Sequence, residues 1–489
     1  MNMHQATSKV PYINELKSWF EGSSDIVMTK RTYKEKGSPV SLEFLYCSNL
    51  VDMKYINEVI FPCIHTVVEV EDDLNIDQLR NLIEVSGLKD KKNVKTEVEQ
   101  KLFSGELIIF SYKMNELFFI PASAIPKRSP EESNLEPSVR GPRDGFVENI
   151  SDNLALIHQR LKTSSLKSIE YTVGERSRTK LILLYIDDIM NPSILENVKK
   201  RLESIKIDIV VSSYEIEEHL YDKVFSIFPL TDYIGRPDFA VQSLNQGRFV
   251  VLVEGNPTCL IGPTNFNQIL YSPEDVHESF FYTSLVRILR LTAVFATVYL
   301  PGFYIALITY QIDQVPYSLL ATITVSRLGL PLPAAAEALI MLILFELFKE
   351  GGLRLPKAVG QTVAVLGGLI IGDAAIRAGL TSPTMLVIIA ITVLSGYTLI
   401  NQNLAGNIAI LRFIVLLFSG FLGLLGFFVS FFLITTLVVS LESFGEPYVS
   451  YLSKPHKMDI IKNFIMLPSR FRKKRNQAYS PIDSDSQKE

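Results

Sequence analysis

Residues 290–311 read RLTAVFATVYLPGFYIALITYQ, an apolar run long enough to cross a lipid bilayer as a helix. Arg287 and Arg290 stand at its amino-terminal end. The chain has 48 Lys and Arg and 52 Asp and Glu residues, and only 11 of these lie between residues 291 and 441. Because a charge in the hydrocarbon core of a bilayer costs several kcal/mol, this depletion predicts an integral membrane protein.

Further apolar runs predict additional spans. Residues 358–376 and 383–404 are candidate spans, and residues 408–441 form either one tilted helix or two short ones, since glycines interrupt them. Residues 334–348 predict a short helix that contains Glu337 and Glu346. These two acids are expected in a protein-shielded interface rather than in a proton path.

Basic residues flank the apolar region on both sides. Besides the arginines before the first span, the segment 470–475 is rich in Arg and Lys. By the positive-inside rule, both the N-terminal and the C-terminal regions are predicted in the cytoplasm. This requires an even number of crossings, either four or six.

The part before the first span predicts a soluble α/β region of two subdomains, because short alternating strands such as residues 40–46 and 107–120 interleave with amphipathic helices. The stretch 107–120 is expected to form a hairpin that turns near Asn115. A further strand is expected at residues 207–211. The predicted domains are an N-terminal α/β subdomain (1–125), a linker with four prolines (126–144), a second α/β subdomain (145–285), a helical membrane domain (286–445) and a basic cytoplasmic tail (446–489).

Nothing in the soluble region indicates an enzyme. The chain has no GxxxxGK[ST], GxSxG or HExxH motif, and its six histidines are scattered singly. Its three cysteines form no CxxC pair, so they are expected to be buried thiols. We therefore predict no catalytic residue, cofactor or metal ligand, and the net charge of −4 gives no indication of nucleic-acid binding.

Two series of residues in the apolar region repeat with the spacing of a helix face. The first is a small-residue ridge that permits close helix packing, and the second is the neighbouring stripe, which has polar residues at its ends and apolar residues between them. The ridge consists of Gly360, Ala364, Gly368 and Gly372, and the stripe consists of Gln361, Val365, Leu369 and Asp373.

The stripe has two interpretations. If several copies of the chain pack through the ridge, the stripe faces a central axis and forms a pore with an apolar constriction. Alternatively, both series are packing faces inside one subunit, and Asp373 reaches the membrane interface and pairs with Arg377.

An ordered set of short motifs resembles one family. The set resembles the A subunit of the GerA-type spore germination receptors of endospore-forming bacteria over residues 141–448. It comprises GPRDGFVENI (141–150), VGERSRTK (173–180), RPD (236–238), EGNP (254–257), SPED (272–275), LPGFYIAL (300–307), RLPKAVGQ (354–361), GGLIIGDAAIRAGLTSP (367–383) and SFGEPY (443–448). Two positions depart from the family pattern: Leu342 replaces an expected acid, and His277 replaces an expected aromatic residue.

The resemblance implies a membrane protein of the inner spore membrane that acts with a transporter-like B subunit and a lipoprotein C subunit. In this family small nutrients trigger germination, and ion release is an early event. The A subunit is then expected to be a homo-oligomer that conducts ions or transmits the signal. A secondary transporter or a non-conducting scaffold subunit is the alternative, although the chain has no convincing internal repeat of the kind that transporters show.

Overall fold

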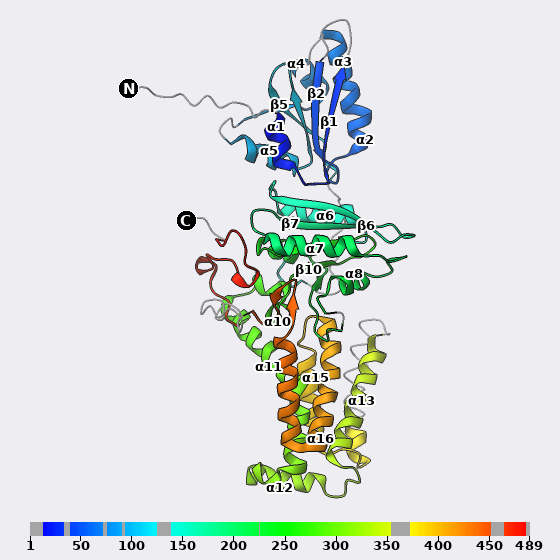
Figure 1. The fold of residues 1–489 in the computed structure, drawn as a ribbon, viewed down its shortest axis with the longest axis vertical. Coiled ribbons are helices and arrows are strands. Elements are labelled where there is room, and N and C mark those ends of the chain that lie inside the picture. The colour runs from blue at the N-terminus through cyan, green and yellow to red at the C-terminus, as the bar shows by residue number, and fades with distance from the viewer. Residues whose placement is uncertain are drawn as a thin grey trace, which may run out of the picture. The chain divides into compact units, whose positions relative to one another are not determined.

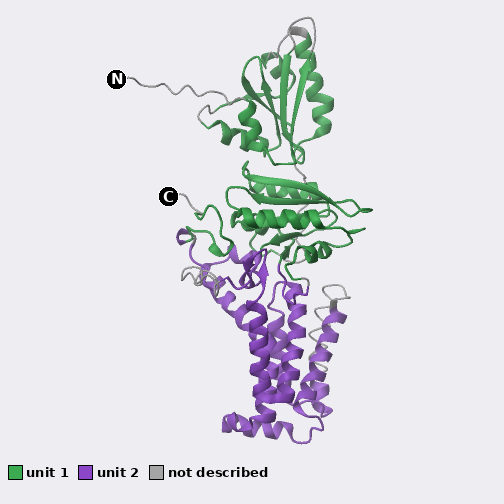
Figure 2. Ribbon diagram, viewed as in Figure 1, with its two compact units in different colours: residues 1–224, 231–263, 472–489 green, residues 225–230, 264–471 purple. Residues whose placement is uncertain are grey.

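The computed structural model describes residues 13–33, 40–71, 76–89, 93–124, 138–223, 225–353, 372–450 and 464–485. The chain divides into two compact units (Figure 2). Residues 1–224, 231–263 and 472–489 form the α/β unit, and residues 225–230 and 264–471 form the helical unit. The predicted fold class, an α/β region followed by a helical region, is confirmed.

The first sheet of the α/β unit is entirely antiparallel, with the strand order β1-β2-β4-β5-β3 (Figure 1). One of its faces packs on α3 (Phe61–Glu71) and α4 (Ile76–Leu82), and the other packs on α1 (Ile13–Phe20) and α5 (Val94–Leu102). The positive φ of Asn115 makes the predicted tight turn between β4 and β5. The strands are β1 (Ile26–Tyr33), β2 (Val40–Cys47), β3 (Ser86–Gly87), β4 (Glu106–Ser111) and β5 (Glu116–Pro121).

The second sheet is also antiparallel, with the strand order β6-β7-β9-β10-β8. Every residue of the FVVLV strand is buried, as expected for an inner strand with both faces covered. The helices around it are α6 (Ile150–Arg160), α7 (Pro192–Ser204), α8 (Ser213–Leu220) and α9 (Pro237–Asn245). The strands are β6 (Leu166–Val173), β7 (Thr179–Ile186), β8 (Asp232–Ile234), β9 (Phe249–Val253) and β10 (Cys259–Gly262).

The predicted strand at residues 207–211 is wrong. These residues are irregular, and the side chains of Ile209 and Val211 are exposed. The side chains of Ile209 and Val211 are therefore not buried against a sheet. Instead, Asp208 pairs with Arg176 at the turn between β6 and β7.

Helix α6 is shared by both subdomains. Its residues Ile150, Leu154 and Ile157 belong to the core of the second sheet, whereas Ala155 belongs to the core of the first. The ring of His158 stacks on Phe103 of the first subdomain, with 4.8 Å between centroids. Because α6 buries two faces, it joins the two subdomains.

The helical unit is built around α11 (Phe280–Tyr310), a long helix that continues through Pro301. Helix α15 (Pro383–Gly396) runs antiparallel to it, since the hydroxyl of Tyr304 donates to Thr384 and Thr297 approaches Gly396. Helix α13 (Ala334–Leu353) completes a shared apolar core, in which Leu342 is fully buried. The short helix α12 (Tyr317–Arg327) connects α11 to α13.

Gly423 divides α16 (Gln402–Val439) into two helices that run in opposite directions. Its backbone is non-helical, with φ of 61° and ψ of −141°. A Cβ on Gly426 would overlap the carbonyl oxygen of Phe418, an approach that a continuous helix with a rise of about 1.5 Å per residue does not allow. The sequence left open one tilted helix or two short ones, and the structure has two.

Contacts near the two ends of α16 agree with this reversal. The Asn407 amide donates to the carbonyl of Ile227 at 2.6 Å, and the Ser443 hydroxyl donates to the carbonyl of Leu230 at 2.7 Å. Both ends of α16 therefore lie against one short segment of the helical unit.

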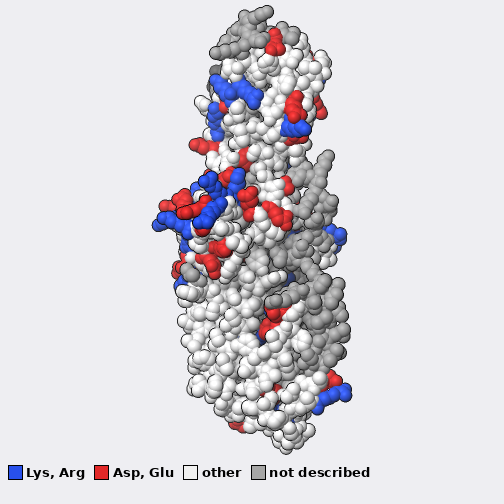
Figure 3. All heavy atoms as spheres, turned by 90° about the vertical axis from the view of Figure 1, so that its right-hand side faces the viewer, with Lys and Arg blue, Asp and Glu red and all other residues white. Residues whose placement is uncertain are grey.

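Among the described residues, α11 and the apolar run of α16, which Gly423 divides, have the length and composition to cross a membrane. The part of the helical unit visible in Figure 3 has few Lys, Arg, Asp or Glu side chains, whereas the α/β unit has many on this face. This distribution agrees with the charge depletion of the sequence.

Candidate functional site

Most of the ridge and of the stripe falls outside the described residues. This holds for Gly360, Ala364 and Gly368 of the ridge and for Gln361, Val365 and Leu369 of the stripe. Gly372 and Asp373 are described and are helical. The pore and packing interpretations of these series both stay predictions.

Gly372 and Asp373 have different surroundings. A Cβ on Gly372 would lie 3.0 Å from the side chain of Leu386, so this glycine lies close to α15. Asp373 accepts a hydrogen bond from Nε of Arg377 at 2.8 Å, and both side chains are exposed. The described end of the stripe therefore has the local ion pair that the packing interpretation requires.

Glu337, near the start of α13, is a completely buried acid within the apolar helical unit. One carboxylate oxygen accepts from Nη1 of Arg327 at 2.8 Å. The other accepts from the Ser382 backbone amide at 2.6 Å, and from the Ser382 and Thr381 hydroxyls at 2.8 and 3.0 Å. Because a buried charge needs such partners, Glu337 fastens α12 and the start of α15 to α13.

A second acid of α13 is paired further along the helix. Glu346 accepts a hydrogen bond from Nη2 of Arg412, an almost fully buried arginine of α16. Lys349 lies 3.8 Å from the other oxygen of Glu346. Both acids of α13 therefore have basic partners from other helices, as a shielded interface requires.

The SPED motif fastens the start of α11. Ser272 and Asp275 form a capping box around a short helical turn (Pro273–Val276). The buried carboxylate of Asp275 accepts two hydrogen bonds from Nη1 of Arg290, both at 2.9 Å, and lies 3.4 Å from Nε of Arg287. We call Asp275, Arg287 and Arg290 the α11 clamp.

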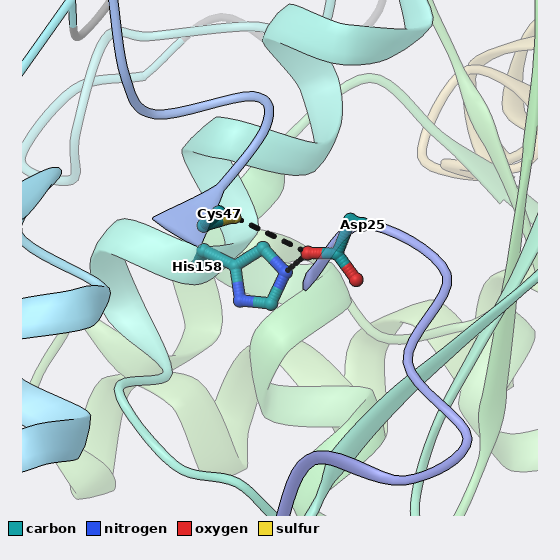
Figure 4. A group of neighbouring side chains, drawn as sticks. All are labelled: Asp25, Cys47 and His158. Carbon is teal, nitrogen blue, oxygen red and sulfur yellow. Dashed lines mark hydrogen bonds and ion pairs between the residues drawn. The ribbon is translucent and has the colours of Figure 1, made fainter. Parts of the chain in front are cut away.

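A further polar cluster lies at the junction of the two α/β subdomains. Asp25 precedes β1, Cys47 ends β2 and His158 lies in α6, and Figure 4 shows their side chains pointing toward one another. Nε2 of His158 is 2.7 Å from Oδ2 of Asp25, and the Cys47 thiol donates to the same oxygen at 3.4 Å. The Ser168 hydroxyl donates to Oδ1.

This cluster contains the residue types of a cysteine nucleophile and its base, but its arrangement differs. The described hydrogen bond of the thiol is to Asp25 rather than to the imidazole. Burial, together with the negative charge of Asp25, raises the pKa of the Cys47 thiol. A buried and protonated thiol is a poor nucleophile.

The sequence did not reveal this junction cluster. Ser168 and Asp25 are 143 residues apart, and no motif connects them. The buried thiol of Cys47 was expected, but its position beside His158 depends on the packing of α6 between the two sheets. No local pattern in the sequence could predict this cluster, because its residues come from both subdomains.

The comparisons with known proteins agree with the ordered motifs. The family model described as Bacillus/Clostridium GerA spore germination protein matches residues 14–478. The chain belongs to the GerA family. Spore germination protein XA of Bacillus anthracis is 41% identical over 480 residues, which cover 97% of each chain.

Two further matches of this GerA protein are a membrane protein and a solved N-terminal domain. An uncharacterized membrane protein of Bacillus subtilis (strain 168), YfkQ, is 34% identical and covers 92% of this chain and 86% of its own. The crystal structure of the N-terminal domain of the A subunit of the Bacillus megaterium spore germinant receptor GerK3 matches at 22% identity. That match has a TM-score of 0.39 and covers 52% of this chain and 94% of that one.

Proposed function

We propose that this GerA protein is the A subunit of a nutrient-responsive germination receptor, and that its helical unit forms an oligomeric element that conducts ions or transmits the signal. It acts with a transporter-like B subunit and a lipoprotein C subunit in the inner spore membrane. Membership of the GerA family and the apolar helical unit support this proposal. The chain has a receptor role rather than an enzymatic one.

The α11 clamp is the observation that carries the signalling part. Asp275 is buried and bound to both arginines of an apolar helix, so a displacement of the turn at residues 273–276 acts directly on α11. Hydrogen bonds between charged groups are stronger and more directional than apolar contacts, so they hold the turn and α11 in one relative orientation. The clamp therefore suits the transmission of a movement from this turn to α11.

The ion-conducting part rests on the sequence of the stripe. Gln361, Val365, Leu369 and Asp373 line the pore in this proposal, and the ridge of Gly360, Ala364, Gly368 and Gly372 allows neighbouring helices to approach. The N-terminal and C-terminal regions lie in the cytoplasm, by the positive-inside rule.

The oligomeric state of the full chain tests this function. The chain is purified in mild detergent, and its mass is measured by native mass spectrometry and by light scattering. A ring of three or more copies supports the channel. A monomer or dimer that releases no ions from liposomes contradicts it and favours the transporter or scaffold alternative.

A further inference from the structure

The junction cluster brings together three kinds of metal ligand. The carboxylate of Asp25, the thiol of Cys47 and the imidazole of His158 offer donor atoms that all lie within 4.8 Å of one another. They come from three separate elements, and each residue is at most 4% exposed. This spacing and burial distinguish the cluster from a group of acids on a solvated surface.

The imidazole of His158 provides a second, independent observation. Both of its ring nitrogens are buried; Nε2 forms an ion pair with Oδ2 of Asp25 at 2.7 Å, and Nδ1 has no hydrogen-bond partner among the described residues. Buried polar atoms without a hydrogen bond are rare in folded proteins, and a bound ion is one way in which such atoms gain a partner.

The donor set selects the metal. Thiolate and imidazole ligands favour Zn²⁺ over Mg²⁺ and Ca²⁺, which prefer oxygen. Asp25 and a deprotonated Cys47 would together balance the two charges of the ion, so the buried site would be neutral. With zinc bonds of about 2.0 Å to N and O and 2.3 Å to S, ligand atoms stand roughly 3.3–3.5 Å apart. The observed 3.4 Å between the sulfur of Cys47 and Oδ2 of Asp25 already matches this separation.

The surroundings of the cluster hold the ligands in place. The Ser168 hydroxyl donates to Oδ1 of Asp25, so Oδ2 stays turned toward His158 and Cys47. Phe103 stacks on the imidazole at an interplanar angle of 11° and fixes the plane of the ring. Partners of this kind orient the ligands of established metal sites.

We propose that Asp25, Cys47 and His158 bind one Zn²⁺ ion that fastens the two α/β subdomains to each other. Asp25 and Cys47 belong to the first subdomain, and His158 belongs to the second. On binding, the Cys47 thiol releases its proton and the distance between Nε2 of His158 and Oδ2 of Asp25 opens by about half an ångström. Ser168 is a positioning residue for the carboxylate.

The test is the zinc content of the full chain. The chain is produced with zinc in the medium, purified in detergent, dialysed against a weak chelator and measured by inductively coupled plasma mass spectrometry. We expect about one zinc per chain, and a loss of at least about ten-fold in Cys47→Ser and in Asp25→Asn. Ser168→Ala should retain the ligands but bind zinc about 10–100-fold more weakly.

Cys63→Ser is the matched control, since Cys63 is a half-buried cysteine of the same subdomain outside the cluster. It should retain the zinc of the unsubstituted chain. Cobalt provides a measurement that needs no variant: the chain loaded with Co²⁺ should show a thiolate-to-cobalt absorption band in the near ultraviolet. Two results would overturn the proposal: an unsubstituted chain that holds no zinc and shows no such band, or a Cys47→Ser chain that retains its zinc. Either result leaves a buried ion pair of Asp25 and His158 in place of a metal site.

Discussion

Arg412, buried in the first half of α16, pairs with Glu346 of α13. The pair is the counterpart of Arg327 and Glu337 near the start of α13, so α13 is held by two ion pairs within an apolar unit. A buried pair is strongly destabilised when one partner is removed, because the other charge stays in the apolar environment. The two pairs therefore connect α13 to α12 and to α16.

Removing one charge of this pair should harm the chain more than removing both. Glu346→Leu leaves Arg412 buried without its partner and should cost on the order of 2–3 kcal/mol, since Glu346 is partly exposed. Adding Arg412→Met should restore most of the stability, because two apolar side chains of similar size pack in place of the pair. The melting temperature in detergent and the amount of chain in spore membranes measure this effect.

Asp373→Asn is the control for this series. It removes the exposed ion pair with Arg377, one helical turn away, and should cost less than about 0.5 kcal/mol. A double variant no more stable than Glu346→Leu alone would show that the pair does not fasten α13 to α16.

The reversal at Gly423 should tolerate no side chain. Gly423→Ala places a Cβ 2.9 Å from the Tyr310 side chain on a backbone with φ of 61°, so we expect a loss of on the order of 1–3 kcal/mol. Gly406→Ala is the matched control: it lies in the same element, with nothing within 4 Å of an added Cβ, and should be neutral or stabilising. Equal melting temperatures for the two variants would contradict a tight reversal.

Loss of the α11 clamp should slow nutrient-triggered germination without lowering the amount of the chain in the membrane. Asp275→Asn keeps the size of the side chain but removes the charge that Arg287 and Arg290 share. We expect nutrient-triggered germination to slow about five-fold or more, with the chain still inserted at normal amounts. Release of dipicolinic acid and an immunoblot of spore membranes measure the two quantities.

Asp313→Asn controls for the loss of an acid next to α11. Asp313 is exposed beyond the other end of the helix, so its replacement should leave germination unchanged. Asp275→Asn spores that germinate at the normal rate with normal amounts of the chain would rule out the clamp as the coupling element.

The sequence predicted the fold class, an α/β region followed by a helical region, because charge depletion and strand alternation are local properties. It also placed the turn at Asn115, where a short polar residue adopts a positive φ at little cost. The prediction of a strand at 207–211 was wrong because apolar residues in a sequence do not show whether a neighbouring strand is present to pair with. Val211 is in fact exposed. Strand β1 was overlooked because its end is exposed and carries Lys30 and Arg31.

Contacts between residues that are far apart in the chain could not be predicted from the sequence. Three glycines in residues 408–441 fit both a tilted helix and a reversal, and the backbone of Gly423 together with the approach of Gly426 to Phe418 decides between them. The partners of Glu337 come from α12 and α15, so the shielding of this acid was predicted but its partners were not. The cluster of Asp25, Cys47 and His158 forms only when α6 packs between the two subdomains.

The stripe and the ridge should respond differently to substitution if the stripe lines a pore. Gly368→Leu places a bulky side chain on the ridge, so helix packing and assembly should fail. Val365→Ala and Leu369→Ala remove bulk from an apolar constriction, and should favour hydration and ion leak without nutrient. Potassium release from dormant spores measures the leak. Normal or reduced ion release from Val365→Ala and Leu369→Ala spores would exclude these two residues as the gate.

Glu217 of α8 should make the stability of the α/β unit depend on pH. Burial of its carboxylate, which accepts hydrogen bonds from Tyr221 and Thr231, raises its pKa above the usual value of 4.5. Because the folded chain holds this proton more tightly than the unfolded chain, the contribution to stability is fully present below pH 4.5 and is lost as the pH rises through the folded pKa.

Glu217→Gln keeps a hydrogen-bond acceptor but cannot ionise, so it should gain stability relative to the unsubstituted chain as the pH rises from 4 toward 7.5. The melting temperature of the full chain in detergent, followed by the fluorescence of Trp19, its single tryptophan, measures the difference. Glu218→Gln removes a neighbouring exposed carboxylate and should shift the melting temperature little at either pH. A Glu217→Gln chain that loses stability relative to the unsubstituted chain over this pH range would show that the hydrogen bonds to the carboxylate outweigh its burial, because the folded state would then favour the charged form.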